Sequence, residues 1–127
     1  MSVIAERHGW VVKTVGDEVM FAVEDPRDAA LIALELTERI GADEVLPGIR
    51  TGLALGPVLV RFGDAFGQVV NTAARLTSVA KPDTVLVDPA LAEALEGVDG
   101  LHLRSMRPVR VHGMRRLAPH ALRRDHS

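Results

Sequence analysis

Two Asp-Pro dipeptides, Asp25-Pro26 and Asp88-Pro89, each follow an apolar strand-like run and constrain how this chain can be built. Aspartate caps the N-terminus of a helix with its side chain. Proline is favoured at the first helical position, where a missing N–H costs nothing. Each dipeptide therefore predicts that a strand ends and a helix begins, so strands and helices must alternate along the chain.

The remaining elements follow from hydrophobic periodicity and from glycine and proline positions. Paired strands between helices predict an α+β fold, in which helices pack on one side of a mostly antiparallel sheet. The first eight residues are expected to end a helix before Gly9. The expected strands are 10–15 with 18–23, 49–55 with 58–62 across Gly56-Pro57, then 84–87, 101–111 and 117–123; the expected helices are 26–41, 67–80 and one from Pro89 to near Gly97.

A chain of 127 residues without cysteine fits a single domain, 1–127, in a reducing compartment, and a cytoplasmic location is expected. The longest apolar run, Ala29 to Leu34, is far too short to span a membrane. Residues 101–127 carry 7 Arg against one acid, Asp125. No aromatic residues are interleaved with these arginines, so nucleic acid is not expected as a partner. A solvated arginine-rich edge and phosphate contact by one or two arginines both remain open.

Five polar residues lie in two distinctive segments, "VVKTVGDEVMF" (11–21) and "GDAFGQVVNTAARLTSVAKP" (63–82). Lys13 and Asp17 belong to the first segment, and Asp64, Asn71 and Arg75 to the second. Asn71 and Arg75 are four residues apart and therefore share one face of the predicted helix. Taken singly, each residue is also typical of an ordinary turn, strand or solvated helix face.

Taken together, the two segments resemble the catalytic domain of the class III nucleotidyl cyclases, of the adenylate type. The second segment contains the family signature F-G-x-x-V-N-x-A-A-R-L in full, and "IRTGLALGPV" matches the strand segment between the two. The resemblance covers essentially all of the chain. It implies a ferredoxin-like, palm-type sheet and conversion of ATP to 3′,5′-cyclic AMP and pyrophosphate.

The resemblance also implies a role for each residue. Asp17 would bind metal, as one of two carboxylates that hold two Mg²⁺ or Mn²⁺ ions. Lys13 and Asp64 would read the adenine edge, Asn71 would orient the ribose, and Arg75 would meet the charge that builds on the α-phosphate. Each active site of the family lies between two chains, so a homodimer is implied.

The chain departs from the family pattern at its start. The family's first metal-binding aspartate lies on an opening strand roughly forty residues before the hairpin aspartate, whereas Glu6 is the only acid before Asp17. The opening strand and first helices are therefore expected to be absent. The family's triphosphate-binding residue near the C-terminus has two candidates, Arg115 and Arg116.

The sequence also allows two alternatives to an active adenylate cyclase. A catalytically inactive remnant would only dimerise, bind nucleotide, or pair with an intact cyclase domain. A diguanylate cyclase has a similar acidic turn, but it requires a glycine and a phenylalanine where this chain has Val15 and Val19. It also lacks the Asn71/Arg75 helix, so this second alternative is disfavoured.

Overall fold

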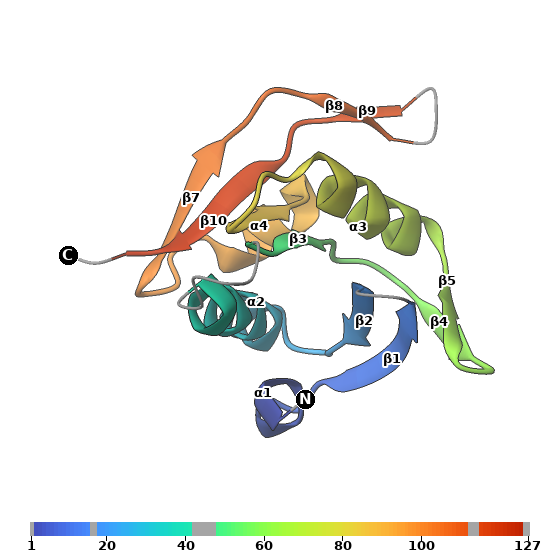
Figure 1. Cartoon of the computed structure of the whole chain (residues 1–127). Helices are drawn as coiled ribbons and strands as arrows, with labels where there is room; N and C mark the ends of the chain where they lie inside the picture. The colour runs from blue at the N-terminus through green and yellow to red at the C-terminus, as the bar shows by residue number, and fades with distance from the viewer. Residues whose placement is uncertain (1, 16–17, 42–47, 112–114, 126–127) are drawn as a thin grey trace.

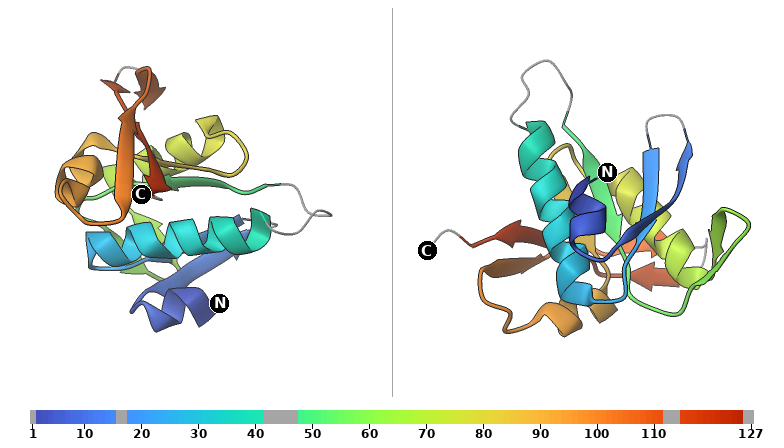
Figure 2. Two further views of the ribbon diagram at one scale, coloured as in Figure 1. Left: turned by 90° about the vertical axis from the view of Figure 1, so that its left-hand side faces the viewer. Right: turned by 90° about the horizontal axis from the view of Figure 1, so that it is seen from below.

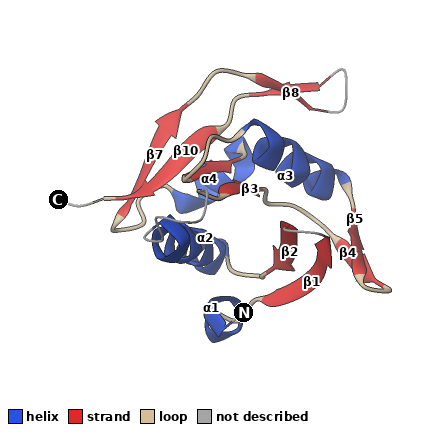
Figure 3. Ribbon diagram, in the orientation of Figure 1, coloured by secondary structure: helices blue, strands red, loops and turns tan. Residues whose placement is uncertain are grey.

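A computed structural model describes residues 2–15, 18–41, 48–111 and 115–125 of the chain (Figures 1 and 3). The helices are α1 (Ser2–Glu6), α2 (Pro26–Gly41), α3 (Gln68–Val79) and α4 (Pro89–Leu95). The strands are β1 (Trp10–Val15), β2 (Glu18–Ala22), β3 (Arg50–Leu53), β4 (Leu59–Arg61), β5 (Asp64–Phe66), β6 (Thr84–Val87), β7 (Leu101–Ser105), β8 (Val109–Val111), β9 (Arg115–Leu117) and β10 (His120–Arg124).

The largest sheet has four strands in the order β3-β6-β10-β7. Strand β10 pairs antiparallel with both β6 and β7, whereas β3 and β6 pair in parallel. The hairpins β1–β2, β4–β5 and β8–β9 form three separate two-stranded sheets. Among the described strands antiparallel pairing dominates, and the predicted α+β class is confirmed.

The prediction that the helices share one side of the sheet is wrong. Val85 and Val87 of β6 pack in a core cluster with α2 and α4, whereas Leu86 between them packs against Leu76 of α3. Neighbouring side chains of a strand point to opposite faces, so the sheet is covered on both sides (Figure 2). The physical reason is the parallel β3–β6 pair, because such a pair needs a crossover connection, and here that connection carries α3.

Both predicted helix starts are confirmed. The Asp25 carboxylate accepts a hydrogen bond from the N–H of Arg27 at 2.8 Å, and α2 begins at Pro26. The Asp88 carboxylate accepts from the N–H of Leu91 at 2.9 Å and from the N–H of Leu55 at 3.3 Å. Asp88 is buried, so it both caps α4 and fastens the segment that leaves β3.

The predicted pairing of 49–55 with 58–62 across Gly56-Pro57 is also wrong. Strand β3 pairs with β6, and β4 pairs instead with β5 in a hairpin that turns at Phe62 and Gly63. Both turn residues have positive φ, 52° and 70°, as two-residue hairpin turns of type I′ require. The sequence signal was obscured because phenylalanine is unusual at such a position.

The single strand expected at 101–111 is divided into β7 and β8. The N–H of Met106 donates to the carbonyl of Pro119 at 2.9 Å, after which β8 leaves the main sheet and pairs with β9. The resulting ribbon packs Val111 and Leu117 over α3.

The N-terminal elements follow the prediction. Helix α1 ends before Gly9, whose N–H donates to the carbonyl of Ile4 at 2.9 Å, and the hairpin β1–β2 follows. Ile4 packs with Ile32 of α2 in a third core cluster. None of the helices in the described ranges has the length and apolar character needed to cross a membrane.

Candidate functional site

Lys13 of β1 and Asp64 of β5 come from two hairpins 51 residues apart in sequence and meet in an ion pair. The Lys13 Nζ lies 2.8 Å from the Asp64 Oδ1, and both side chains are about one-third exposed, at 34% and 39%. The same Oδ1 accepts the N–H of Ala65 at 2.8 Å. The hydrogen bond from Lys13, together with that N–H, holds the pKa of the Asp64 carboxyl below its ordinary value. The carboxyl therefore stays ionised at neutral pH, as a hydrogen-bond acceptor.

The direction of Lys13 depends on an irregularity in β1. The strand register shifts between Val11 and Lys13, so that Lys13 pairs with Met20 and Val12 is left as the extra residue. Such a bulge re-aims the side chains that follow it. Regular alternation in the sequence does not reveal this shift, so the contact with Asp64 was not predictable from the strand pattern.

Asp64, which could also have been an ordinary turn residue, is the first residue of strand β5. Three residues later the chain turns at Gly67, with φ 139°, and α3 begins at Gln68. A side chain at Gly67 would be strained by this backbone angle. The turn at Gly67 therefore places β5, which carries Asp64, directly before the start of α3.

Asn71 and Arg75 lie on the exposed face of α3, as the four-residue spacing predicted. The next residue after each, Thr72 and Leu76, lies about 100° further round the helix and is buried. The Arg75 Nε donates to the carbonyl oxygen of Arg110 in β8 at 2.8 Å, and its Nη1 lies 3.5 Å from the Ser78 hydroxyl. The guanidinium is thus oriented by a neighbouring strand, with donors still available for a ligand.

A second feature beside Arg75 was not predicted. Arg110 of β8 lies directly opposite Arg116 of β9, and both residues are exposed. Like charges directly opposite one another destabilise a strand pair. A bound anion would offset this cost. The sequence contained a signal, because Arg110 and Arg116 are equally distant from Gly113.

Asp17, the predicted metal ligand, lies outside the described residues. Within the described ranges no group of three or more His, Asp or Glu side chains could hold a metal ion. The role of Asp17 therefore stays a prediction from the family resemblance.

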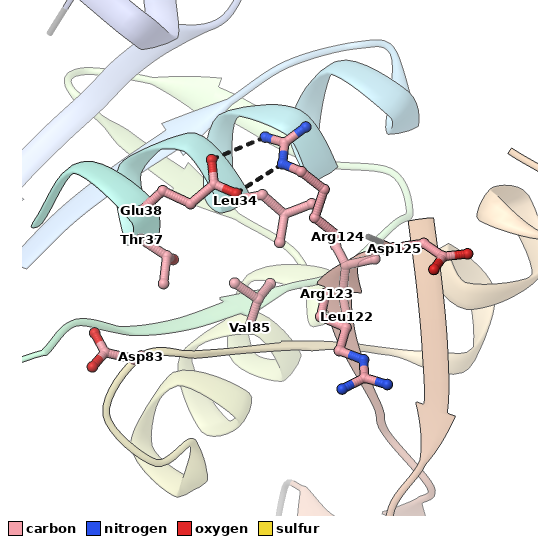
Figure 4. A pocket seen from close by; sticks show the side chains of 9 residues that line it. All are labelled: Leu34, Thr37, Glu38, Asp83, Val85, Leu122, Arg123, Arg124 and Asp125. Atoms are coloured by element: carbon pink, nitrogen blue, oxygen red, sulfur yellow. Dashed lines mark hydrogen bonds and ion pairs between the residues drawn. The ribbon is translucent and has the colours of Figure 1, made fainter. Parts of the chain in front are cut away.

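A cavity of about 450 Å³ lies elsewhere, between α2 and the ends of β6 and β10 (Figure 4). One wall is formed by Arg124, whose guanidinium binds both carboxylate oxygens of Glu38, at 2.7 and 3.1 Å. This contact holds the pKa of Arg124 above its ordinary value. Of the described residues, neither the Lys13–Asp64 pair nor Asn71 or Arg75 lines this cavity, so the candidate site is the exposed surface around Lys13, Asp64 and α3.

Comparison with protein families matches residues 2–124 to the model described as "Adenylate and Guanylate cyclase catalytic domain". An adenylate cyclase of Streptomyces coelicolor is 53% identical over 92 residues, which are 72% of this chain and 24% of that protein. An adenylate cyclase of Glutamicibacter nicotianae is 39% identical over 120 residues, or 94% of this chain and 30% of that protein. The chain therefore spans less than one third of the length of these relatives.

The fold has a counterpart among solved structures. The crystal structure of an adenylate/guanylate cyclase/hydrolase from Silicibacter pomeroyi matches with a TM-score of 0.86. It is 24% identical, and the match covers 98% of this chain and 78% of that chain. The structural match agrees with the palm-type fold that the two sequence segments implied.

Proposed function

The chain belongs to the family of adenylate and guanylate cyclase catalytic domains, and on that premise we propose that it converts ATP to cyclic AMP and pyrophosphate. The ribose 3′-oxygen attacks the α-phosphorus, the bond to the bridging oxygen of pyrophosphate breaks, and the hydroxyl proton passes to solvent. The observation that carries this proposal is the 2.8 Å contact between Lys13 and Asp64 at the start of the helix that bears Asn71 and Arg75.

Lys13 and Asp64 are proposed to select adenine. The Asp64 carboxylate is ionised and can accept from the exocyclic amine of adenine, while the Lys13 ammonium donates to a ring nitrogen. Guanine presents a carbonyl oxygen at the position of the amine, so that it would face the carboxylate and leave both groups badly matched. A site built on hydrogen bonds rejects such an analogue strongly, because its polar groups are left unpaired.

Asn71 and Arg75 are proposed to act on the ribose and on the α-phosphate. The Arg75 guanidinium is held by the carbonyl of Arg110, which supports the idea that it is oriented before the substrate binds. A fixed cation aimed at developing negative charge stabilises the transition state without a cost of reorganisation. Arg116, opposite Arg110, is the better of the two candidates for the remaining phosphates, because an anion there would offset the repulsion between two arginines.

Mg²⁺ or Mn²⁺ is proposed as the cofactor, with Asp17 as one ligand. Hard cations of this kind prefer carboxylate oxygens, and when bound they neutralise the triphosphate and acidify the attacking hydroxyl. The described residues include no group of three or more His, Asp or Glu side chains that could supply the remaining ligands.

A second copy of the chain, or an intact cyclase domain, is proposed as the partner. Every large exposed apolar side chain of the described residues lies in the β1–β2 and β4–β5 hairpins or at Leu55 and Val58. We call this the hairpin surface. It includes the two hairpins that carry Lys13 and Asp64, whose strands β1 and β5 are in contact, and a group of exposed apolar side chains is typical of an interaction site.

The test is formation of cyclic AMP from Mn²⁺-ATP by the purified chain. Arg75→Ala is expected to lower turnover about 10²- to 10³-fold, and Asp17→Ala to abolish it. Arg104→Ala, at an exposed arginine of β7 outside the site, is the matched control and should leave turnover unchanged. GTP should be converted at least about 100-fold more slowly than ATP.

Titration calorimetry with a non-reacting ATP analogue separates the two functions that the sequence left open. Nucleotide binding without turnover, in a folded wild-type chain, would favour the inactive remnant. Addition of an intact cyclase domain whose own arginine is substituted would then show whether this chain supplies Arg75 in trans. Absence of both binding and turnover would contradict the proposal.

A further inference from the structure

Strand β3 and helix α3 approach one another more closely than side chains normally permit. A Cβ atom built at Gly52, within β3, would lie 2.4 Å from the carbonyl oxygen of Ala73 and 2.4 Å from the backbone nitrogen of Thr77. It would also lie 2.7 Å from the Thr77 hydroxyl. Carbon makes favourable contacts at roughly 3.5–4 Å, so even alanine cannot fit unless the strand and the helix move apart.

The contacted part of α3 cannot easily move aside. Two of the three nearest atoms belong to the helix backbone, and the third, the Thr77 hydroxyl, donates to the Ala73 carbonyl at 2.9 Å. Gly52 therefore rests against a fixed helical turn. None of the three nearest atoms belongs to a flexible side chain that could move away.

Backbone conformation does not explain the glycine. Gly52 pairs with Leu86 in the parallel β3–β6 ladder, and its φ lies outside the positive range that favours glycine. Glycine inside a strand is less stable than alanine, because it loses more conformational freedom on folding. Gly56, four residues on, is different, because a Cβ there would meet Val69 at an ordinary 3.4 Å. Close approach to α3 is therefore the property that only glycine supplies at position 52.

We infer that Gly52 is a positioning residue for the cyclase reaction, an inference that rests on the proposed roles of Asn71 and Arg75. The turn from Ala73 to Thr77 contains Arg75 and begins two residues after Asn71. The spacing set by Gly52 therefore fixes how far both side chains stand from the base-reading pair on β1 and β5. Alanine would displace α3 by about 1 Å, and a misplacement of that size in a reacting geometry can cost about 10²-fold.

The experiment compares Gly52→Ala with the matched control Gly56→Ala in the full chain, at a temperature where both are folded by circular dichroism. Turnover of Mn²⁺-ATP by Gly52→Ala is expected to fall about 10²-fold, with KM changed less than about threefold. KM should change little because Lys13 and Asp64, which are proposed to bind the base, lie on β1 and β5 and not on the displaced turn of α3. Gly56→Ala should retain both values.

A second readout is independent of activity. The Arg75 Nε–H, which donates to the Arg110 carbonyl at 2.8 Å, gives its own signal in a ¹H–¹⁵N spectrum. Slow exchange of this proton with water is expected in the wild type and in Gly56→Ala, and fast exchange in Gly52→Ala. Val87→Ala, a core variant on the opposite face of the sheet, serves as a control for general loss of stability and should keep slow exchange.

The possible outcomes distinguish failure of the positioning role of Gly52 from failure of the proposed cyclase function. Normal turnover and slow Arg75 exchange in Gly52→Ala would overturn the positioning role while the cyclase proposal stands. Loss of slow exchange in Gly52→Ala, in a chain whose wild type neither binds nor converts nucleotide, would support the geometry and defeat the proposed function. If Gly52→Ala does not fold, Gly52→Ala/Thr77→Ala removes the hydroxyl contact. Failure of both to fold would make Gly52 a requirement of the fold as a whole and overturn the inference.

Discussion

The four-stranded sheet of this chain buries its large apolar side chains, whereas the hairpin region, β1–β2 with β4–β5, leaves many of them exposed. The four-stranded sheet, with α2, α3 and α4, buries its large apolar residues in two core clusters. The hairpin region, β1–β2 and β4–β5, leaves Leu59 52% exposed and Phe62 98% exposed. Two-stranded hairpins are at best marginally stable by themselves. The sheet thus supplies the stability of the fold, while the hairpins keep an apolar surface and a polar pair available for other molecules.

The two regions also differ in their proposed roles. Lys13 and Asp64, which are proposed to bind the base, lie in the hairpin region, whereas Asn71 and Arg75 lie on a helix that packs on the sheet. Contacts with substrate or partner come from the less stable part of a fold in many proteins. In this chain α3 connects the two parts, since its start adjoins β5 and its buried face belongs to the core. Substitutions in the two regions should therefore separate stability from binding.

The largest expected effect lies in the core of the sheet region. Leu95 of α4 is 2% exposed, so Leu95→Ala should lower the free energy of unfolding by about 2–5 kcal/mol. Leu59→Ala, at an exposed leucine of β4, should change it by less than about 0.5 kcal/mol. Urea denaturation of both variants measures the contrast. Similar losses would mean that the hairpins contribute to the core as much as the sheet does.

The next effect concerns the link between the two regions. Asp88 is buried and accepts hydrogen bonds from the N–H groups of Leu91 and Leu55. Asp88→Ala removes a helix cap and leaves both donors without this partner, so a loss of about 1–2 kcal/mol is expected by thermal or urea unfolding. Asp25→Ala, at the exposed cap of α2, is the control and should cost less. Equal costs would argue against a linking role for Asp88.

A smaller effect of opposite sign is expected at the tip of β4–β5. Phe62 has φ 52°, an unfavourable conformation for an aromatic residue, and its side chain is almost fully exposed. Phe62→Asn should raise the free energy of unfolding by about 0.5–1 kcal/mol, because asparagine tolerates this conformation. The same variant should weaken self-association, as measured by sedimentation. Destabilisation without any change in association would show that Phe62 packs within the monomer.

The smallest effect on stability is expected at the ion pair itself. Lys13→Met should leave the free energy of unfolding almost unchanged, since exposed ion pairs contribute little. The pKa of Asp64 should rise toward its ordinary value of 3.8, which a carboxyl NMR titration measures. The affinity for ATP should fall about tenfold if Lys13 donates to adenine.

The sign of the pH dependence at Asp64 follows from the direction of its pKa shift. The pKa of this carboxyl is lower in the folded chain than its ordinary value. Its stabilising contribution is therefore complete above that ordinary value and is lost as the pH falls through the folded pKa. In Lys13→Met this acid-dependent change should largely disappear. A folded-chain pKa that Lys13→Met leaves unchanged would show that the Ala65 N–H alone sets it.

Local signals in the sequence predicted the elements well. The two Asp-Pro dipeptides located the starts of α2 and α4, and the four-residue spacing placed Asn71 and Arg75 on one exposed face. Cap chemistry and helical periodicity act within a few residues, which is why they can be read from one sequence. The pairing of β3 with β6 could not be read this way, because strand pairing depends on residues far apart in the chain.

The sequence by itself showed the family, through two segments whose order and spacing match it, and so predicted which residues would form the proposed site. Only the tertiary structure decided how they meet. A bulge beside Val12 turns Lys13, a strained hairpin at Phe62 makes Asp64 part of a strand, and the absence of a side chain at Gly52 lets β3 approach α3. Each of these is a balance between backbone strain and packing against distant residues, and such a balance exists only once the chain is folded.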